Sequence, residues 1–297
     1  MDKIRSIVVA TDFSALSDAA VARATSLARL DGAAVHLVHA LTFPLIVTYS
    51  YEVSLPPSLW DDLRAAARAK LEQIRKAIEA NGVANVTAQI SDLPDAVSAI
   101  AEAAKAHQAD LVVMGTHGRG GLQHAFLGSV AERTLRTIDR PIIAVKEDPE
   151  RAAKPIAKIL LAVDFSAHSD RAVAVAADLA ARVSASVDVI HAFDVPSEYN
   201  PYLSTVGTEL ERKIEEGVSE RLGRIRQKLE SRGIRANVHV RRGRPDTVIA
   251  ETAKQIGCQL IAMGTRGQSG VAHVLLGSVA ERTLRAAPCA VLCSKAA

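Results

Sequence analysis

Apolar residues in the first half of this chain follow two patterns that alternate along the sequence. Short continuous runs rich in Val, Ile and Ala are typical of buried strands. These runs cover residues 4–11, 33–40, 83–90, 109–115 and 141–145. Longer stretches with an apolar residue at every third or fourth position predict amphipathic helices. The helical stretches lie between the runs, at 17–30, 57–80, 94–107 and 129–138.

Glycine and proline mark the ends of several of these elements. Gly32 follows the first helical stretch, Asn81-Gly82 closes the second, and Pro94 is placed to open the third. Glycine suits a helix C-terminus and proline a first helical position. Because strands that alternate with helices form parallel sheets covered on both faces, the pattern predicts an α/β fold. Five strands fit a doubly wound, Rossmann-like sheet, which binds ligands beyond the carboxyl ends of its strands.

The pattern occurs twice in the chain. VVATDFSALSD at 8–18 returns as LLAVDFSAHSD at 160–170. MGTHGRGGLQHAFLGSVAERTLR at 114–136 returns as MGTRGQSGVAHVLLGSVAERTLR at 263–285, with 16 of 23 residues identical. An internal repeat of this length marks a duplicated structural unit.

We therefore expect two tandem domains of the same fold, each a five-stranded parallel sheet between helices. Residues 1–147 form the first domain and 155–297 the second. The linker at 148–154 lies in a charged stretch that contains proline, as domain boundaries often do.

Composition narrows the classes of partner and compartment. The 297 residues carry 36 basic and 33 acidic side chains, a net charge of +3, which is too balanced to indicate binding to nucleic acid or to a membrane surface. No apolar run reaches the roughly 20 residues of a membrane span, and the N-terminus lacks the pattern of a signal peptide. We expect a cytoplasmic protein whose cysteines, Cys258, Cys289 and Cys293, are reduced and buried.

A glycine-rich segment follows the fourth strand of each copy and carries the clearest chemical signal. It reads Gly115-x2-Gly118-x9-Gly128-Ser129 in the first copy, and the same spacing begins at Gly264 in the second. Glycines here would let the backbone adopt positive φ and approach a ligand closely. The N–H groups at the following helix start, with the helix dipole, would bind phosphate oxygens. No Gly-Lys-Ser/Thr follows and the position is not that of a dinucleotide fingerprint, so the segment belongs to neither of those classes.

Two further features of the site allow a structural as well as a functional interpretation. Ser129-x-x-Glu132 matches a capping box, in which the serine satisfies the helix N-terminus with or without a phosphate contact. Asp12 and its counterpart Asp164 end the first strand of each copy, where they could accept from a ribose or base, lie near a phosphate-bound metal, or cap the next helix.

His39, near the end of the second strand, is expected to be a half-buried structural histidine.

The repeated segments resemble the universal stress protein family. The resemblance rests on the Asp-Phe-Ser turn after the first strand, the histidine near the end of the second, and the Gly-x2-Gly-x9-Gly-Ser motif followed by Val-Ala-Glu-Arg-x-Leu-Arg. In that family this glycine motif separates members that bind ATP from those that do not. The resemblance implies two tandem domains with the adenine nucleotide α hydrolase-like fold, each with four helices around its sheet. It also implies an ATP-binding regulator of the stress response, with Mg²⁺ as an accompanying ion.

The resemblance also implies a set of nucleotide-binding residues in each copy. Residues at the ends of the first two strands would lie near the adenosine, those ending the fourth strand near the ribose, and the rest around the phosphates. In the first copy the set is Ala10, Asp12, Ala40, Met114, Gly115, Gly118, Arg119, Gly128, Ser129 and Val130. In the second it is Ala162, Asp164, Ala192, Met263, Gly264, Gly267, Gly277, Ser278 and Val279. No catalytic residue and no metal ligand is assigned, so at most slow ATP hydrolysis is expected.

The copies differ in ways that predict unequal sites. His117 and Arg119 are candidates for polyphosphate contact, and Arg266 replaces the histidine in the second copy. The last strands, 141–145 and 290–293, could pair within one chain as a pseudo-dimer, and the family also forms dimers through this strand. Two alternatives stay open: a nucleotide-activating enzyme, whose signature motifs are lacking, and an interaction module in which one half binds no nucleotide. The loops at 43–60 and 193–206 are predicted lids or partner surfaces.

Overall fold

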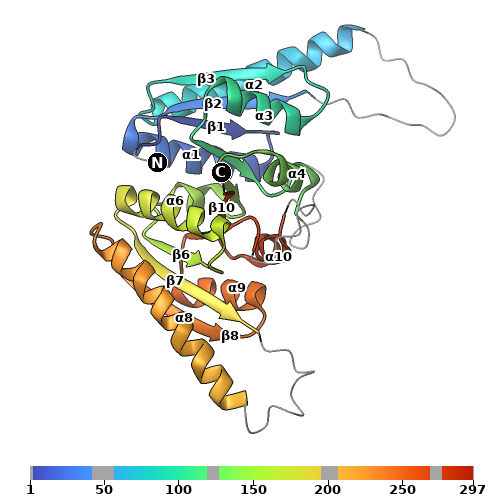
Figure 1. Ribbon diagram of the computed structural model, residues 1–297. Helices are drawn as coiled ribbons and strands as arrows, with labels where there is room; N and C mark the ends of the chain where they lie inside the picture. Colours follow the sequence, from blue (N-terminus) through green and yellow to red (C-terminus); the bar gives the residue numbers. More distant parts are fainter. Residues whose placement is uncertain (1–2, 42–56, 119–126, 195–206, 268–275, 297) are drawn as a thin grey trace, which may run out of the picture.

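The computed structural model describes residues 3–41, 57–118, 127–194, 207–267 and 276–296, which form two α/β domains in an elongated molecule (Figure 1). The first domain contains β1 (Ser6–Ala10), α1 (Ala15–Asp31), β2 (Ala34–Ala40), α2 (Pro57–Ala80), β3 (Val86–Ser91), α3 (Ala96–Ala106), β4 (Leu111–Gly115), α4 (Ser129–Thr137) and β5 (Ile142–Val145). A short helix, α5 (Pro149–Ala153), follows. The second contains β6 (Lys158–Ala162), α6 (Ala167–Val183), β7 (Ser186–Phe193), α8 (Gly207–Glu230), β8 (Ala236–Arg242), α9 (Pro245–Ile256), β9 (Leu260–Gly264), α10 (Ser278–Ala286) and β10 (Ala290–Ser294).

The strands in the described part of the chain join one ten-stranded sheet, in the order β3-β2-β1-β4-β5-β10-β9-β6-β7-β8. Within each domain the neighbouring strands are parallel, as predicted. The two domains meet where β5 and β10 pair antiparallel. Ile143 lies opposite Leu292, its own counterpart in the repeat, so the junction is symmetric about that pair. The predicted pairing of the last strands within one chain is confirmed.

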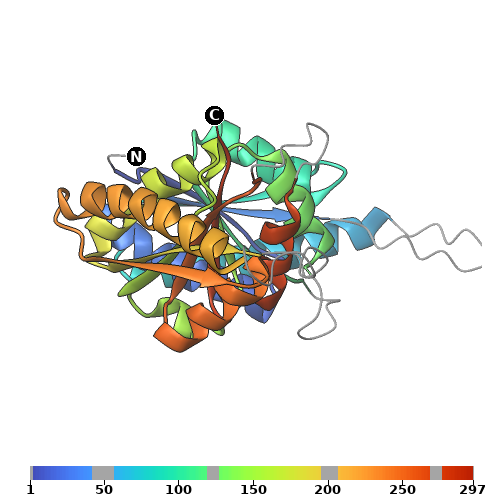
Figure 2. The ribbon, with the colours of Figure 1, turned by 60° about the horizontal axis from the view of Figure 1, so that its bottom comes forward.

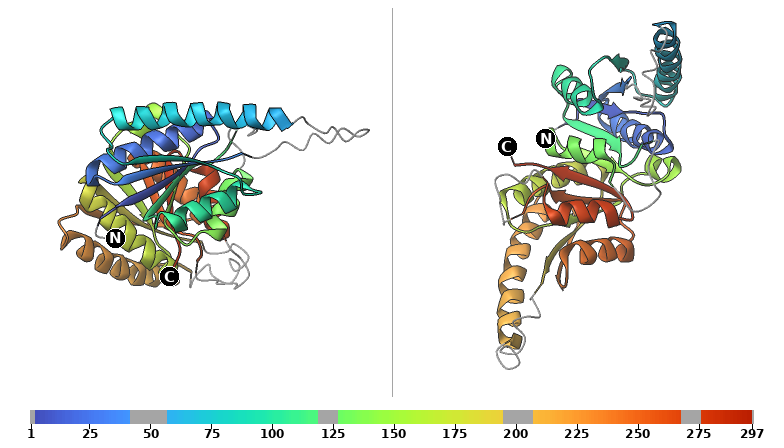
Figure 3. Two further views of the ribbon diagram at one scale, coloured as in Figure 1. Left: turned by 90° about the horizontal axis from the view of Figure 1, so that it is seen from above. Right: turned by 90° about the vertical axis from the view of Figure 1, so that its right-hand side faces the viewer.

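Strand side chains alternate between the two faces of the sheet, and apolar side chains stand on both. Helices therefore cover both faces. Ile7 and Val9 point into a core under α1, α2, α6 and α8, whereas Val8 points into a second core under α3, α4, α9 and α10. The helices α2 and α8 lie at opposite ends of the molecule (Figures 1 and 3). Figure 2 brings α8 and the edge strand β8 forward. Both cores draw on both domains and are mainly aliphatic.

The stretch predicted as a linker contains the helix α5, which packs against α1. Arg23 of α1 is 1% exposed and reaches this segment from inside the protein. Its Nη1 donates to the carbonyl of Lys154 at 2.8 Å, and its Nη2 donates to Glu147 at 2.9 Å. The segment between the domains is therefore fixed to the first domain.

Two lysines connect the domains in a reciprocal manner. Lys146, after β5, donates to the carbonyl of Arg285 at the end of α10 (2.5 Å). Lys295, after β10, donates to the carbonyl of Arg136 at the end of α4 (2.7 Å). A cation at a helix C-terminus satisfies an otherwise open carbonyl and complements the helix dipole. Each domain thus caps a helix of the other.

Several local expectations can now be compared with the structure. The helix α2 has the predicted bounds, whereas Pro94 does not open α3: Asp95 is its N-cap and accepts from the amides of Val97 and Ser98. All three cysteines are buried and free, as predicted. Among the residues that the structure describes, no helix is both long and apolar enough to cross a bilayer.

Candidate functional site

A cavity of about 550 Å³ opens at the carboxyl ends of β1 and β4. These strands are neighbours at the point where the strand order reverses, which is where ligands bind in open α/β sheets. The cavity is closed laterally by the starts of α1, α3 and α4. Its lining consists of Ala10, Thr11, Asp12, Ser17, Val38, Ala40, Ala96, Ala99, Ile100, Met114, Gly115, Thr116, His117, Gly118, Gly128, Ser129, Val130 and Ala131.

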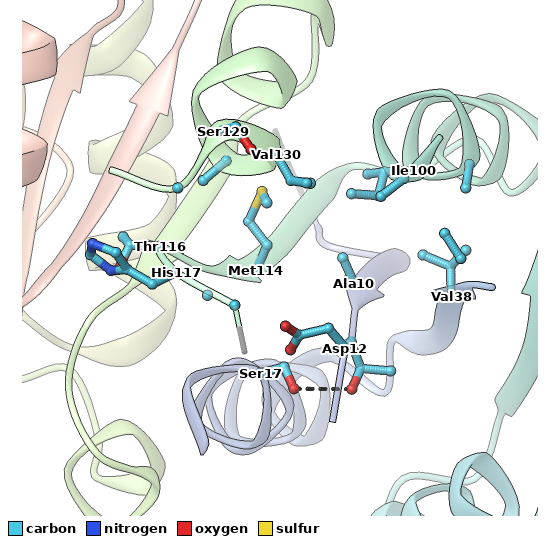
Figure 4. A pocket seen from close by; sticks show the side chains of 18 residues that line it. Ala10, Asp12, Ser17, Val38, Ile100, Met114, Thr116, His117, Ser129 and Val130 are labelled. Atoms are coloured by element: carbon cyan, nitrogen blue, oxygen red, sulfur yellow. Dashed lines mark hydrogen bonds between the residues drawn. The ribbon is translucent and has the colours of Figure 1, made fainter. Parts of the chain in front are cut away.

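The lining is apolar at one end and polar at the other (Figure 4). Val38 and Ile100 lie on one side of the cavity, and Thr116 and His117 lie on the opposite side. Asp12 lies between them, below Met114. A ligand with a flat apolar group and a charged tail matches this division.

Asp12 is positioned by the turn that follows β1. Its Oδ1 accepts from the amide of Ser14 (3.1 Å) and from the Ser14 hydroxyl (2.6 Å). Ser14, not Asp12, is the N-cap of α1, because its side chain accepts from the amide of Ser17. The alternative that Asp12 itself caps the helix is therefore wrong. The pKa of Asp18, in the first turn of this helix, is raised mainly by burial and to a lesser degree by the nearby Asp12 carboxylate.

The turn contains a residue in an unusual conformation. Phe13 has φ of 63°, in the left-handed region that bulky residues rarely adopt, and its counterpart Phe165 has φ of 62°. Such strained residues persist where surrounding contacts fix them and cluster at functional sites. The amide of Phe13 donates to Thr11 Oγ1 at 3.1 Å, and its ring lies 4.3 Å from that of His39. The same strained turn in both domains fixes the aspartate at both cavities.

His39 supports the turn from β2. Its Nδ1 lies 2.8 Å from the carbonyl oxygen of Thr11, and the residue is 4% exposed. Because a carbonyl can only accept, Nδ1 carries the proton. His191 makes the same contact with the carbonyl of Val163 at 2.8 Å. The expected structural histidine is confirmed, but His39 is fully buried and not half-buried as predicted.

The motif glycines do not have the backbone conformation expected of them. Gly128 and Gly277 have φ of −63° and −70°, and the other motif glycines are not among those with positive φ. Their role is close approach. A Cβ on Gly118 would lie 2.5 Å from Asp12 Oδ2, and one on Gly128 would lie 2.9 Å from the carbonyl oxygen of Thr116. Glycine is required because the Asp12 carboxylate and the backbone just after β4 leave no room for a side chain.

The start of α4 departs from the capping-box prediction. Gly128 is the N-cap and makes no side-chain cap, and Ser129 is the first helical residue. Glu132 pairs with Arg136 at 2.5 Å instead of reaching back to the N-cap. The N–H groups of the first turn therefore face the cavity without a capping side chain, and they provide an anion site at the positive end of the helix dipole.

The second domain has a smaller cavity, of about 140 Å³, in the same place. Three of its lining positions carry larger side chains: Ile190 replaces Val38, Pro245 replaces Ala96, and Arg266 replaces His117. Its lining consists of Ala162, Val163, Asp164, Ile190, Ala192, Pro245, Ile249, Met263, Gly264, Thr265, Arg266, Gly267, Gly277, Ser278, Val279 and Ala280. Burial, and next the charge of Arg266, lower the pKa of His168 at the start of α6.

The structure brings together the site residues predicted from sequence. Every predicted residue lines its cavity except Arg119, which lies outside the described residues, as do most of the two predicted lid loops. The role of these lining residues as nucleotide ligands stays a prediction. Sequence reasoning missed the apolar walls, Val38 and Ile100, although Val38 lies two positions before Ala40 and so shares its side of the strand.

A family model of the universal stress protein family matches residues 3–146 and 155–295, which together make up nearly the whole chain. The chain belongs to the universal stress protein family. A universal stress protein of Mycolicibacterium smegmatis is 29% identical over 295 residues, covering 96% of this chain and 95% of the relative. One of Mycobacterium tuberculosis strain H37Rv is 27% identical over 292 residues, covering 97% and 96%.

The fold of the universal stress proteins is also seen among solved structures. A universal stress protein from Archaeoglobus fulgidus DSM 4304 superposes with a TM-score of 0.69 at 22% identity, covering 99% of this chain and 97% of that one. At this identity the likeness concerns the fold alone. Both relatives and this neighbour span almost the same length as the present chain.

Proposed function

We propose that this universal stress protein binds ATP in the larger cavity and acts as a nucleotide-dependent regulator. The observation that carries the proposal is a single cavity with an apolar end, formed by Val38, Ile100 and Met114, and an uncapped helix N-terminus at its other end. An adenine ring fits the apolar end, and phosphate oxygens fit the N–H groups of α4.

The size of the cavity supports a ligand of this class. Its volume of about 550 Å³ lies within the ~300–1,000 Å³ of most small-molecule sites. Three or four charge-assisted hydrogen bonds to the phosphates would give micromolar affinity, about −8 kcal/mol, after ordering costs. An accompanying Mg²⁺ would be held chiefly by phosphate oxygens, with Asp12 as the carboxylate of the cavity.

The Ser129→Glu variant tests ATP binding without weakening the helix. A carboxylate at the first position of α4 suits the helix dipole, so the unliganded variant keeps or raises its melting temperature. The same carboxylate repels the phosphates, so we expect ATP affinity to fall at least about tenfold, which is ~1.4 kcal/mol. Isothermal titration calorimetry measures the affinity, and thermal unfolding with and without ATP measures the stabilisation.

The matched control is Ser278→Glu, at the corresponding position of α10 in the smaller cavity. It should leave ATP affinity at the larger cavity unchanged. Wild-type protein that shows no thermal shift with ATP, or a Ser129→Glu variant that binds ATP as wild type does, would contradict the proposal. For a regulator, nucleotide bound over a long incubation is recovered mainly as ATP; its recovery mainly as ADP would indicate an enzyme instead.

A further inference from the structure

The smaller cavity lacks room for a nucleoside. Its volume of about 140 Å³ is well below the ~300 Å³ of the smallest common small-molecule sites. At the apolar end, Ile190 of β7 and Pro245 of α9 replace smaller residues of the first cavity. The end that would accept an adenine ring is therefore narrower than in the first domain.

The other end of the smaller cavity holds polar groups without partners. Thr265 is 2% exposed and lines the cavity, and its hydroxyl has no hydrogen-bond partner. In the first domain the equivalent hydroxyl, on Thr116, lies 2.9 Å from His117 Nδ1. Arg266 replaces that histidine, and its own Nε is buried and also without a partner. Because unsatisfied buried polar groups are costly, these two groups point to a ligand that accepts hydrogen bonds.

The helix α10 completes the polar end. Gly277 is its N-cap and makes no side-chain cap, and Ser278 and Val279 of its first turn line the cavity. Asp164 also lines it, but its Oδ1 already accepts from the amide and hydroxyl of Ser166 (3.1 and 2.6 Å). Arg266 lines the same cavity and supplies a positive charge to it.

We propose that the smaller cavity binds a small inorganic phosphate anion, orthophosphate or pyrophosphate, and excludes nucleotides. Thr265, the Arg266 guanidinium and the N–H groups at the start of α10 hold the anion. The two halves of the chain then bind different ligands: a nucleotide in the first and a bare phosphate group in the second. The inference rests on the proposed ATP binding only in that ATP is used to fill the first cavity.

Calorimetric titration of the full chain with pyrophosphate in the presence of saturating ATP tests the proposal, with orthophosphate as the second probe. ATP occupies the first cavity, so we expect one ATP and one pyrophosphate per chain. Arg266→His, which restores the residue of the first domain, should weaken pyrophosphate at least about tenfold while ATP affinity stays unchanged. Thr265→Val should weaken pyrophosphate several-fold, and the matched Thr116→Val should leave this second binding event unchanged.

A second pair of variants tests the exclusion of nucleotides. Enlarging the smaller cavity with Ile190→Val, Pro245→Ala and Arg266→His should allow a second ATP to bind per chain. The reverse changes in the first domain, Val38→Ile and Ala96→Pro, should weaken ATP there. Proline is tolerated at position 96 because this is the first residue of α3.

The outcomes separate this inference from the proposed function. Two ATP molecules per wild-type chain, no pyrophosphate binding to the ATP-saturated chain, or pyrophosphate binding that Arg266→His leaves unchanged would each overturn the inference. If ATP does not bind at all, the proposed function fails alone. The inference then stands or falls on titration of the Ser129→Glu chain with pyrophosphate, whose single binding event should require Arg266.

Discussion

Single residues show how the two domains use one sheet position differently. His36 on β2 and Asp188 on β7 occupy corresponding register positions inside runs that the sequence pattern treats as apolar. The His36 ring stacks on that of His107, with 3.7 Å between ring centroids. Asp188 is 3% exposed and lies 2.8 Å from His239 Nε2. Each domain has thus acquired its own polar pair at this point.

The histidine pair predicts a loss of stability in mild acid. Burial, and next the neighbouring His107, lower the pKa of His36 to about 4 from its usual 6.5. The unfolded chain therefore binds this proton more readily than the folded chain, and stability present above pH 6.5 is lost as the pH falls toward 4. In His36→Asn we expect a smaller loss between pH 7.5 and 4.5, measured by urea unfolding. An NMR titration of His36 with a midpoint near 6.5 would contradict this explanation.

At the scale of elements, the sequence predicted where helices end, but it did not predict contacts between distant segments. The bounds of α2 follow from Pro57 and from the Asn-Gly pair after Ala80. The motif glycines line the cavities at the strand ends, but their expected positive φ was wrong, because glycine spacing does not distinguish an unusual backbone angle from close approach to neighbouring atoms. The capping box was shifted by one residue, because Ser129 follows the N-cap.

The difference in size between the two cavities could not be predicted from the sequence. Ile190 and Pro245 come from β7 and α9, far along the chain from the glycine segment, and only the fold shows that they meet it. The sequence marked the unequal loop charge at Arg266 but gave no sign of the lost volume. Periodicity assigns a residue to a face of its own element, whereas a cavity depends on which elements face each other.

The position of α5 on α1 leads to a prediction for Arg23. Arg23→Met leaves the Glu147 carboxylate buried, with its side chain 4% exposed, and without its partner. We expect destabilisation of about 3–5 kcal/mol, which is typical of breaking a buried ion pair, measured by urea unfolding. Adding Glu147→Gln should restore most of the loss. Val175, which takes the place of Arg23 in α6, provides a matched control: Val175→Met adds volume to a buried apolar position, so its cost of about 1–3 kcal/mol should not be relieved by Glu147→Gln.

At the scale of the whole molecule, the β5–β10 pairing makes one sheet and two shared cores from two domains. Residues of both domains contribute to each core, and Lys146 and Lys295 cap helices across the junction. Asp31 of α1 and Arg182 of α6 form a further ion pair between the domains. These contacts favour unfolding of the chain as one unit.

The single tryptophan allows a direct measurement of this coupling. Trp60 lies in α2, so its fluorescence reports on the first domain, whereas far-UV circular dichroism reports on both. We expect the two signals to change with the same urea midpoint, the test for a cooperative transition. Replacing Ile143 with Ala at the centre of the junction should lower the free energy of unfolding by about 2–5 kcal/mol. Both urea midpoints should fall together as a result. Fluorescence and dichroism with separate midpoints in the wild type would show that the domains unfold independently.

The antiparallel contact of β5 with β10 also fixes which partner each half meets. If the halves were separate chains with the same contact strand, they would assort into mixed and unmixed pairs. Joined through α5, each half meets its neighbour at an effective concentration that no free chain can match. Every molecule then holds one cavity of each kind, so one half can diverge in sequence without forming pairs that carry two altered sites.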